Sequence, residues 1–420
     1  MIRLLYHPLH TDRLTQINLP SSKSISNRAL MIQALLNWKF GHQMVTLLNL
    51  SKADDTLVMQ HALETSQPVI DLKNAGTCFR FLTAYYALTC TQDKILTGSE
   101  RLKQRPIAGL VDALLAIGAS IEYLEKEGYA PLLIKPAKIQ SIKPLCVASE
   151  NSSQFLSAMV LIAAFLENGI EFDVDPKSAS FSYVLMTLGV LKDFGIKWEL
   201  NGNQLLVFPV KWQSTAQTNY VIEADWSSAA FFYGVQSIVK KDQIFIAGLQ
   251  ENSLQGDLLI IQLAKDLGIT SVFSKSGVCL QSIQGFIPKE SVNWDFSQCP
   301  DLAPVLIIAA VLNFKTGLFT GLENLNYKES QRLQLLNDYL NALGVTTQLT
   351  AKSLEFEKLA AFPCQINTNT AHDHRMVMCL TLLSIAVNSV YLNEVDSVVK
   401  SFPEFWEQAY KLGFGYTISR

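Results

Sequence analysis

The sequence predicts an α/β protein of two domains, each built from three related units. Two sets of segments recur along the chain at nearly constant spacing, and both support this fold class. The first set consists of strongly apolar segments with the pattern of buried helices, and the second of amphipathic helices that end in a glycine. A strand-like stretch follows each of these glycines, so the units combine helices with strands.

The apolar set has six members. They begin near Ser26, Cys78, Gln154, Ser228, Leu302 and His374. Their starts lie 52, 76, 74, 74 and 72 residues apart, so the units share nearly one length except for the first, which is abbreviated. The composition agrees with wholly buried helices, because 49% of the 420 residues are hydrophobic and only 17% are charged, against about 25% in an average soluble domain. The length corresponds to roughly two to three domains.

The glycine-terminated set supplies a second helix. Its members are LVDALLAIG, LMTLGVLKDFG, IIQLAKDLG and QLLNDYLNALG, with a weaker copy at AYKLG, and their glycines stand at positions 118, 195, 268, 344 and 413. Glycine closes a helix well because it adopts the left-handed conformation without strain. Six units divide into two groups of three, and the break should fall near residues 222–226, after the strand-like TNYVIEAD.

Charge, cysteine content and apolar run lengths limit the classes of function. A net charge of −3 gives no general field for nucleic acid, so we expect no nucleic-acid partner. The seven cysteines are widely spread without a CxxC pair, which predicts neither a disulfide framework nor a zinc cluster and favours the reducing cytoplasm. The longest apolar runs, 155–166, 302–312 and 376–387, fall short of the roughly 18 residues of a membrane span, so we expect no membrane partner.

Polar residues precede each apolar helix, and three of the six lead-ins include cations: Lys23 with Arg28, Arg80, and Arg375. A short polar residue alone is an ordinary helix N-cap, which is the simplest interpretation of any single lead-in. A cation at this end opposes the helix dipole by about 0.3–1 kcal/mol unless an anion is bound there. The repeated mismatch therefore predicts a site for a multiply negative ligand.

Two further basic stretches begin amphipathic helices. Arg101, Lys103 and Arg105 lie in RLKQRP. Lys328 and Arg332 lie four residues apart in KESQRL, on one face of a helix. Solvated surface charge is the alternative for either stretch alone. Their place at the start of a segment favours a role in the anion site.

Nine ordered motifs, spread over essentially the whole chain, resemble the enolpyruvyl transferases, most closely those members that act on shikimate 3-phosphate. The motifs are PSSKSISNRAL, NAGTCFRFLTA, RLKQRPIAGLVDAL, SSQFLSA, EADWSSAAFF, PDLAP, KESQRL, HDHRMVMCL and KSFPEFW. The resemblance implies a two-domain inverted α/β barrel built from six repeated βαβαββ-like units, three per domain. It further implies that residues 21–223 form one lobe, and that residues 1–20 plus 224–420 form the other.

The resemblance also implies a reaction. The enolpyruvyl group of phosphoenolpyruvate would be transferred to the 5-hydroxyl of shikimate 3-phosphate, with release of phosphate, in the shikimate pathway. Asp301 would be the base, Glu329 would pass a proton to and from the methylene carbon, and Lys23 would assist at the bridging oxygen. We expect no metal and no organic cofactor, because arginines would neutralise the departing phosphate. We also expect a monomer whose two lobes close on these two substrates.

Binding residues follow from the same motifs. Those implied for shikimate 3-phosphate are Lys23, Ser24, Arg28, Ser152, Ser153, Gln154, Ser180, Asp301, Asn324 and Lys328, with Tyr183 nearby. Those implied for phosphoenolpyruvate are Lys23, Gly76, Arg101, Gln154, Arg332, Arg375 and Lys400, with Thr77 beside the glycine. A residue without a Cβ would leave room there for the ligand.

The chain departs from the family pattern at three positions. Phe81 stands where many members have a proline after NAGTxxR, Gln331 replaces a frequent aspartate in KESQRL, and His372 replaces a small polar residue. The missing carboxylate at position 331 would loosen the orientation of Arg332.

Two alternatives concern local chemistry. His372, Asp373 and His374 could form a metal cluster, although the neighbouring Arg375 and a helix N-terminus would both repel a cation. Cys78 lies at a helix start where a thiolate would be stabilised, and its other interpretation is a small buried side chain.

Two further alternatives concern the whole protein. The related transferase that acts on a UDP-amino sugar would carry Asn in place of Ser24 and a cysteine in a mobile loop, which RLKQRP lacks. A non-catalytic phosphometabolite-binding homologue would be expected to have lost Asp301, Glu329 or Lys23, and all three are present.

Overall fold

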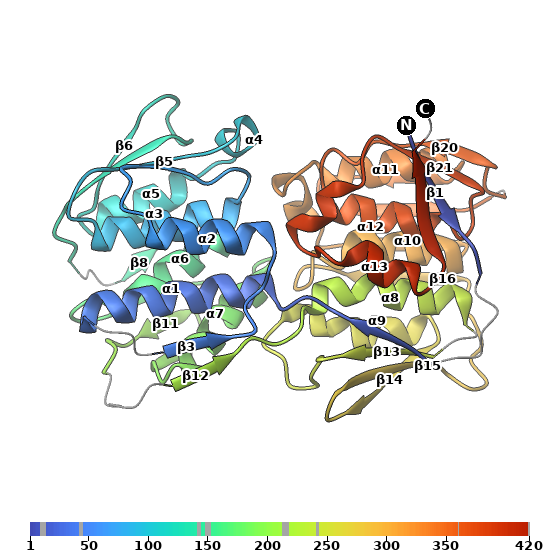
Figure 1. Cartoon of the computed structure of the whole chain (residues 1–420), viewed down its shortest axis with the longest axis horizontal. Helices are drawn as coiled ribbons and strands as arrows, with labels where there is room; N and C mark the ends of the chain where they lie inside the picture. The colour runs from blue at the N-terminus through green and yellow to red at the C-terminus, as the bar shows by residue number, and fades with distance from the viewer. Residues whose placement is uncertain are drawn as a thin grey trace. The chain divides into compact units, whose positions relative to one another are not determined.

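The computed structural model describes residues 1–8, 14–41, 45–140, 144–147, 153–211, 218–240, 243–359 and 361–418. The chain divides into two compact units (Figure 1). Residues Ser21–Ile222 form the first, here called the N-terminal unit. Met1–Pro20 and Glu223–Arg420 together form the second, the C-terminal unit.

The N-terminal unit alternates helices and strands. Its helices are α1 (Lys23–Phe40), α2 (Asp54–Glu64), α3 (Gly76–Thr89), α4 (Glu100–Lys103), α5 (Ala108–Ala116), α6 (Ser153–Ala163) and α7 (Phe181–Asp193). Its strands are β3 (Val45–Leu48), β4 (Val69–Asp71), β5 (Lys94–Thr97), β6 (Ser120–Tyr123), β7 (Leu132–Lys135), β8 (Leu145–Cys146), β9 (Ile170–Asp173), β10 (Trp198–Asn201), β11 (Gln204–Val207) and β12 (Thr218–Val221).

The C-terminal unit follows the same plan. Its helices are α8 (Trp226–Val239), α9 (Ile260–Asp266), α10 (Ala303–Asn313), α11 (Arg332–Ala342), α12 (His374–Leu383) and α13 (Phe405–Tyr410), with 3-10 turns η1 (Gly256–Leu259), η2 (Glu323–Tyr327) and η3 (Asp396–Lys400). Its strands are β1 (Ile2–Tyr6), β2 (Thr15–Asn18), β13 (Ile244–Ala247), β14 (Ile269–Ser274), β15 (Gly277–Ser282), β16 (Ser291–Asp295), β17 (Thr316–Thr320), β18 (Thr346–Leu349), β19 (Leu354–Glu357), β20 (Gln365–Asn367), β21 (Ser389–Leu392) and β22 (Phe414–Ile418).

The sheets show the repeat directly. Five four-stranded sheets, β4-β5-β7-β6, β8-β9-β11-β10, β2-β13-β15-β14, β16-β17-β19-β18 and β20-β21-β1-β22, each begin with a parallel pair and continue with two antiparallel pairs. The parallel pair β12-β3 makes a sixth, two-stranded sheet, so the unit containing the first apolar helix is the short one. The predicted α/β fold with an abbreviated first repeat is confirmed.

Three helices pack together inside each unit. In the N-terminal unit α1, α3 and α6 contact one another, and in the C-terminal unit α8, α10 and α12 do the same (Figure 1). Most of their apolar side chains are almost completely buried, which explains why these segments read as apolar on nearly every face, although Trp38 near the end of α1 is exposed. All six helices begin within three residues of the predicted starts.

The glycine signals correspond to helix ends. Gly118, Gly195, Gly268, Gly344 and Gly413 all have positive φ, between 74° and 97°. They follow α5, α7, α9, α11 and α13 respectively, and an antiparallel strand comes next in each case. The left-handed residue that the sequence pattern requires is therefore present in all five copies.

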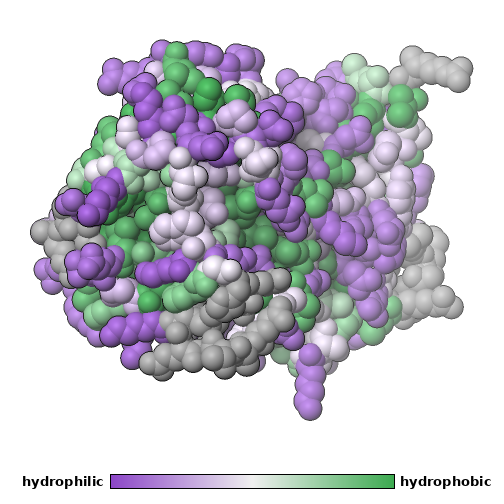
Figure 2. Space-filling model, turned by 60° about the vertical axis from the view of Figure 1, so that its left-hand side comes forward, coloured by the Kyte–Doolittle hydropathy of each residue, from purple (hydrophilic) through white to green (hydrophobic). Residues whose placement is uncertain are grey.

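The outer surface is mixed. Hydrophilic side chains cover much of the face in Figure 2, with hydrophobic ones exposed between them, as is normal for a folded chain. Within the described ranges, none of the helices is both long enough and apolar enough to cross a membrane.

Candidate active site

Helix α1 presents two of the predicted cations of the N-terminal unit. Ser22 caps the helix, since its Oγ accepts a hydrogen bond from the backbone N–H of Ile25 at 3.4 Å. Lys23, the first helical residue, forms an ion pair with Asp55 at 3.0 Å between Nζ and Oδ2. The side chains are 17% and 6% exposed respectively, so this contact is largely shielded from water.

Arg28 is bound by the fold. Its Nε donates to Oγ1 of Thr187 at 2.8 Å, its Nη1 to the carbonyl of Ser24 at 2.8 Å, and its Nη2 to the carbonyl of Tyr183 at 3.0 Å. Burial lowers the pKa of its guanidinium to about 10, which still leaves it charged at neutral pH. Arg28, predicted as a phosphate ligand, therefore ties α1 to α7 in this structure.

A series of side-chain hydrogen bonds links α3 to α6. Arg80 donates from Nη1 to the carbonyl of Gly76 at 3.1 Å and to Oε1 of Gln154 at 3.0 Å. The amide of Gln154 donates in turn to Oγ1 of Thr77 at 2.9 Å. Gln154 is thus fixed beside the NAGT segment, where both predicted substrates would need it.

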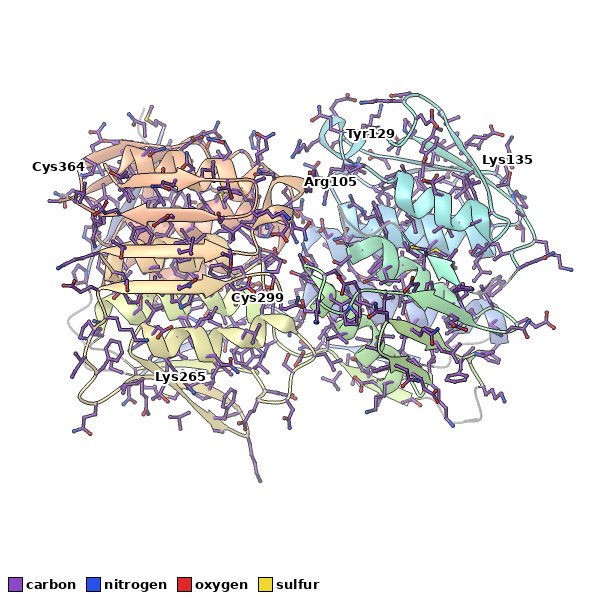
Figure 3. All side chains as sticks on the ribbon, turned by 180° about the vertical axis from the view of Figure 1, so that it is seen from behind. Arg105, Tyr129, Lys135, Lys265, Cys299 and Cys364 are labelled. Atoms are coloured by element: carbon purple, nitrogen blue, oxygen red, sulfur yellow. The ribbon has the colours of Figure 1, made fainter. Side chains whose placement is uncertain are left out.

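Arg105, which belongs to the basic stretch RLKQRP but not to the set implied for phosphoenolpyruvate, lies against Gly76. A Cβ built on Gly76 would overlap the guanidinium of Arg105, and its three nearest atoms all belong to that group. Arg105 is buried and follows α4 (Figure 3), whereas Arg101 lies within α4 and donates to Gln104 at 3.4 Å. Arg105 is therefore a cation that lies beside the predicted phosphoenolpyruvate glycine, and the role implied for Arg101 stays a prediction.

The serines differ in how far the structure describes them. Ser180 is buried and has a left-handed φ of 67°, which is uncommon for a residue with a Cβ and typical of functional sites. Ser153 begins α6, and Ser24 lies in the first turn of α1. Ser152 lies outside the described residues.

Arg332 of the C-terminal unit donates hydrogen bonds to three carboxylates. Its Nη1 donates to Oδ1 of Asp301 at 2.9 Å, its Nη2 to Oε2 of Glu329 at 2.6 Å, and its Nε to Oδ2 of Asp373 at 2.8 Å. The Arg332 side chain is only 1% exposed. Burial by itself would lower its pKa, but the three carboxylates outweigh burial and raise it. One permanently charged group therefore orients three acids.

Asp301 faces three cations. Besides Arg332, Nε of Arg375 lies 3.3 Å and Nζ of Lys328 lies 3.6 Å from its Oδ1. Burial lowers the pKa of Lys328, partly offset by the Asp301 charge. The Asp301 carboxylate thus lies within 3.6 Å of a cationic nitrogen from each of three residues.

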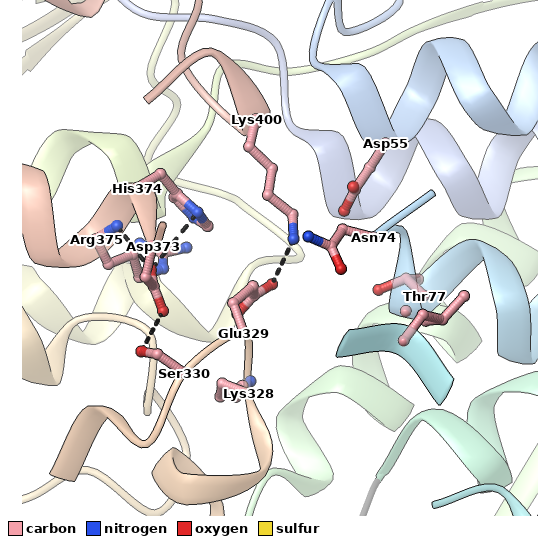
Figure 4. Close-up of polar contacts among 12 residues, drawn as sticks. Asp55, Asn74, Thr77, Lys328, Glu329, Ser330, Asp373, His374, Arg375 and Lys400 are labelled. Carbon is pink, nitrogen blue, oxygen red and sulfur yellow. Dashed lines mark hydrogen bonds and ion pairs between the residues drawn. The ribbon is translucent and has the colours of Figure 1, made fainter. Parts of the chain in front are cut away.

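Glu329 lies close to two cations, Arg332 and Lys400. Its Oε1 lies 3.7 Å from Nζ of Lys400 (Figure 4), while Oε2 accepts from Arg332. Asn324, in η2, is buried a few residues upstream. Within this unit, the predicted residues Asp301, Asn324, Lys328, Glu329, Arg332, Arg375 and Lys400 thus come from the ends of α10, α11 and α12 and from the 3-10 turns η2 and η3.

Asp373 is a buried carboxylate that caps α12. It caps α12 by accepting from the backbone N–H of Arg375 at 2.9 Å, and it accepts from Ser330 Oγ at 2.9 Å (Figure 4) and from Arg332. Burial would raise the pKa of Asp373, but the Arg332 charge lowers it. His374 Nδ1 is 3.7 Å away. Across the part of the chain that the structure describes, no three acidic, histidine or cysteine side chains gather as a metal site.

Asp257 belongs to the same neighbourhood and was not predicted. Asp257 is the second residue of η1 and is buried. Its carboxylate accepts a hydrogen bond from Oγ of Ser227. Burial, with the nearby charge of Asp301, raises the pKa of Asp257 to about 7. Because the QGD segment has no helical or strand pattern of its own, only the fold reveals this acid.

The structure changes the interpretation of the cations at helix N-termini. Lys23 has Asp55, Arg375 has Asp301, and Arg80 has carbonyl and amide oxygens as partners. The chain therefore supplies opposing charge or acceptors itself, so the helix-dipole mismatch does not by itself require a bound anion. Cys78 is a buried thiol that donates to the carbonyl of Asp55, in agreement with the interpretation as a small buried side chain.

Comparison with known proteins gives one consistent result. The family model of EPSP synthase (3-phosphoshikimate 1-carboxyvinyltransferase) matches residues 62–409. The chain is 34% identical over 406 residues to a 3-phosphoshikimate 1-carboxyvinyltransferase of Bacteroides fragilis, with 96% of each chain covered. It is 31% identical to the protein of that name from Actinobacillus pleuropneumoniae, with 94% of this chain and 96% of the relative covered. The solved structure of EPSP synthase from Acinetobacter baumannii superimposes with a TM-score of 0.75 over the whole of both chains, at 20% identity, which supports the fold. On this fold, these motifs and these relatives, the chain belongs to the EPSP synthase family.

Proposed function

We propose that this chain transfers the enolpyruvyl group of phosphoenolpyruvate to the 5-hydroxyl of shikimate 3-phosphate and releases phosphate. One observation carries the proposal beyond family membership. Asp301 and Glu329, the expected base and proton carrier, accept hydrogen bonds from the two ends of the same guanidinium, Arg332, at 2.9 and 2.6 Å. Two acids held in fixed relation suit a reaction that needs proton transfer at an oxygen and at a carbon.

The reaction has an addition step and an elimination step. In the addition, Asp301 takes the proton of the 5-hydroxyl, Glu329 gives a proton to the methylene carbon, and the hydroxyl oxygen bonds to C2. In the elimination, Glu329 takes a proton back from the resulting methyl group as the C2–O bond to phosphate breaks. Phosphate leaves with the bridging oxygen, the proton that Asp301 took from the 5-hydroxyl passes to the departing phosphate, and Lys23 donates a hydrogen bond to the bridging oxygen.

The cations have distinct roles in this proposal. Lys328, Arg332, Arg375 and Lys400 bind carboxylate and phosphate charge on the C-terminal unit, while Gln154 and Gly76 serve the N-terminal unit. We assign Arg105 as the cationic residue that binds phosphoenolpyruvate next to Gly76, because Arg105 lies against that glycine. Arg105 thus takes the role predicted for Arg101. Ser24, Arg28, Ser152, Ser153, Ser180 and Asn324 complete the proposed shikimate 3-phosphate set.

Three organisational points belong to the proposal. The two units would be the two lobes of the transferase, residues 21–223 and residues 1–20 plus 224–420. The chain would act as a monomer, as the resemblance to the enolpyruvyl transferases implies. It would act in the cytoplasm, and its seven cysteines, none of which is in a disulfide among the described residues, are compatible with a reducing compartment.

The test is phosphate release from phosphoenolpyruvate, measured with and without shikimate 3-phosphate. We expect release only when both are present, and a loss of about 10²- to 10⁴-fold in kcat for Asp301→Asn, because general base catalysis contributes that much. Asp338→Asn, an exposed change on α11, is the matched control and should stay near wild type. Release that ignores the shikimate ester, or that survives Asp301→Asn undiminished, contradicts the proposal.

A further inference from the structure

The ion pair between Lys23 and Asp55 joins the N-termini of two helices, α1 and α2. Lys23 is the first residue of α1, where the positive end of the helix dipole disfavours a cation. Asp55 lies in the first turn of α2, where the same effect favours an anion. The two side chains meet at 3.0 Å, and Asp55 is almost completely buried. Asp55 thus offsets the unfavourable position of Lys23 and also stabilises the N-terminus of its own helix.

Asp55 is itself held in place from α3 and α1. The thiol of Cys78 donates to the backbone carbonyl of Asp55 at 2.9 Å, and Nδ2 of Asn27 contacts the Cys78 sulfur at 3.7 Å. Asn27 lies one helical turn after Lys23 on α1, and Cys78 lies two residues after Gly76 on α3. The Asp55 brace, defined as Asn27, Cys78 and Asp55, therefore links the lysine helix to the NAGT segment.

We propose that Asp55 is the positioning residue of Lys23: it fixes the ammonium at one point relative to the Gly76 segment, so that both can engage one phosphate-bearing substrate. This rests on the proposed function only in that Lys23 serves phosphoenolpyruvate. An ammonium carries three N–H donors, so Lys23 can hold Asp55 and a phosphate oxygen together. A lysine without this partner would keep its charge but would sample several rotamers, and misplacement by about 1 Å can cost about 100-fold in rate.

A purely structural role for Asp55 makes a different prediction. If Asp55 only stabilised the N-terminus of α2, its loss would reduce activity equally whether or not Lys23 is present. If it acts through Lys23, its loss should matter only while Lys23 is present. A double-mutant cycle separates these two cases.

The cycle consists of wild type, Asp55→Asn, Lys23→Met and the double variant, assayed for kcat/KM with phosphoenolpyruvate. We expect Asp55→Asn to lower kcat/KM by about 10- to 100-fold in the wild-type background, and by less than about threefold in the Lys23→Met background. Asp54→Asn is the matched control, because Asp54 is the exposed neighbour in the same helical turn, and it should stay within about twofold of wild type. Multiplicative losses in the double variant would overturn the proposal.

A measurement without substrates keeps the proposal independent of the proposed function. Urea unfolding of the same four proteins should show that the midpoint shift of the double variant is smaller than the sum of the two single shifts. If wild type showed no phosphate release, the proposed function would fail while this unfolding cycle still decided the pairing. Additive midpoint shifts would overturn the Lys23–Asp55 pairing whatever the activity.

A third test compares two substitutions of Cys78, the member of the Asp55 brace that lies on α3. Cys78→Ser keeps a hydrogen-bond donor toward the Asp55 carbonyl and Cys78→Ala removes it. We expect Cys78→Ala to lower kcat/KM severalfold and Cys78→Ser to restore most of that loss. Equal kcat/KM for both variants would contradict the brace.

Discussion

Replacement of Asp373 by Asn tests the carboxylate cluster around Arg332 through stability alone. Asp373 is 0% exposed and Arg332 is 1% exposed, and they are joined by hydrogen bonds of 2.8 and 3.2 Å. Asn keeps the volume and an oxygen that can still cap α12 at Arg375, but it removes the negative charge. Breaking one side of a buried ion pair costs about 3–5 kcal/mol. The lower end applies here, because Glu329 and Asp301 still face the guanidinium.

We therefore expect Asp373→Asn to lower the free energy of unfolding by about 3 kcal/mol, measured by urea titration at pH 7 with circular dichroism. Asp373→Ala should lose about 1 kcal/mol more, because it also removes the N-cap. Asp338→Asn, on the exposed face of α11, is the control and should change stability by less than about 0.5 kcal/mol. A loss under about 1 kcal/mol for Asp373→Asn would refute the reasoning, since only a solvent-screened pair is worth so little.

Further predictions concern the phosphoenolpyruvate side and pH. Gly76→Ala should raise KM for phosphoenolpyruvate by about tenfold or more in initial-rate assays, because the added methyl displaces the Arg105 guanidinium; an unchanged KM would contradict that contact. Arg105→Met should raise the same KM more than Arg101→Met does, and the reverse order would restore the original assignment. Burial and the charge of Asp301 raise the pKa of Asp257 in the folded protein from 3.8 to about 7. Between pH 3.8 and about pH 7, the folded protein therefore binds more protons than the unfolded protein. Wild-type stability should therefore fall from about pH 4 to about pH 7 relative to Asp257→Asn, and parallel pH profiles of the two unfolding free energies would contradict this.

The repeat was predictable because it depends on local signals. Apolar helices, polar caps and closing glycines at a spacing near 74 residues are visible in the sequence, and the six buried helices begin where those signals place them. Helix α2 had no such signal: it ends at Glu64 without a closing glycine, and its cap residue, Ala53, makes no side-chain hydrogen bond. Its place beside Lys23 follows from tertiary packing.

The site was predictable in part, and the errors share a cause. Arg101 and Arg105 are four residues apart, so a continuous helix would place them on one face. Helix α4 ends at Lys103, however, and the turn after it carries Arg105 alone to Gly76. The counter-charges Asp55, Asp301 and Asp373 lie far in sequence from some of their cations, and only the fold pairs them.

Phosphoenolpyruvate labelled with ¹⁸O at the oxygen between C2 and phosphorus gives the most direct test of the proposed chemistry. Reaction with shikimate 3-phosphate should place the label in the released inorganic phosphate, because the bond that breaks joins that oxygen to carbon, and mass spectrometry of the phosphate reads this out. Unlabelled phosphate, with the heavy oxygen kept on the three-carbon product, would mean cleavage at phosphorus and would contradict the assignment of Asp301 and Glu329 as acids and bases of an addition followed by an elimination.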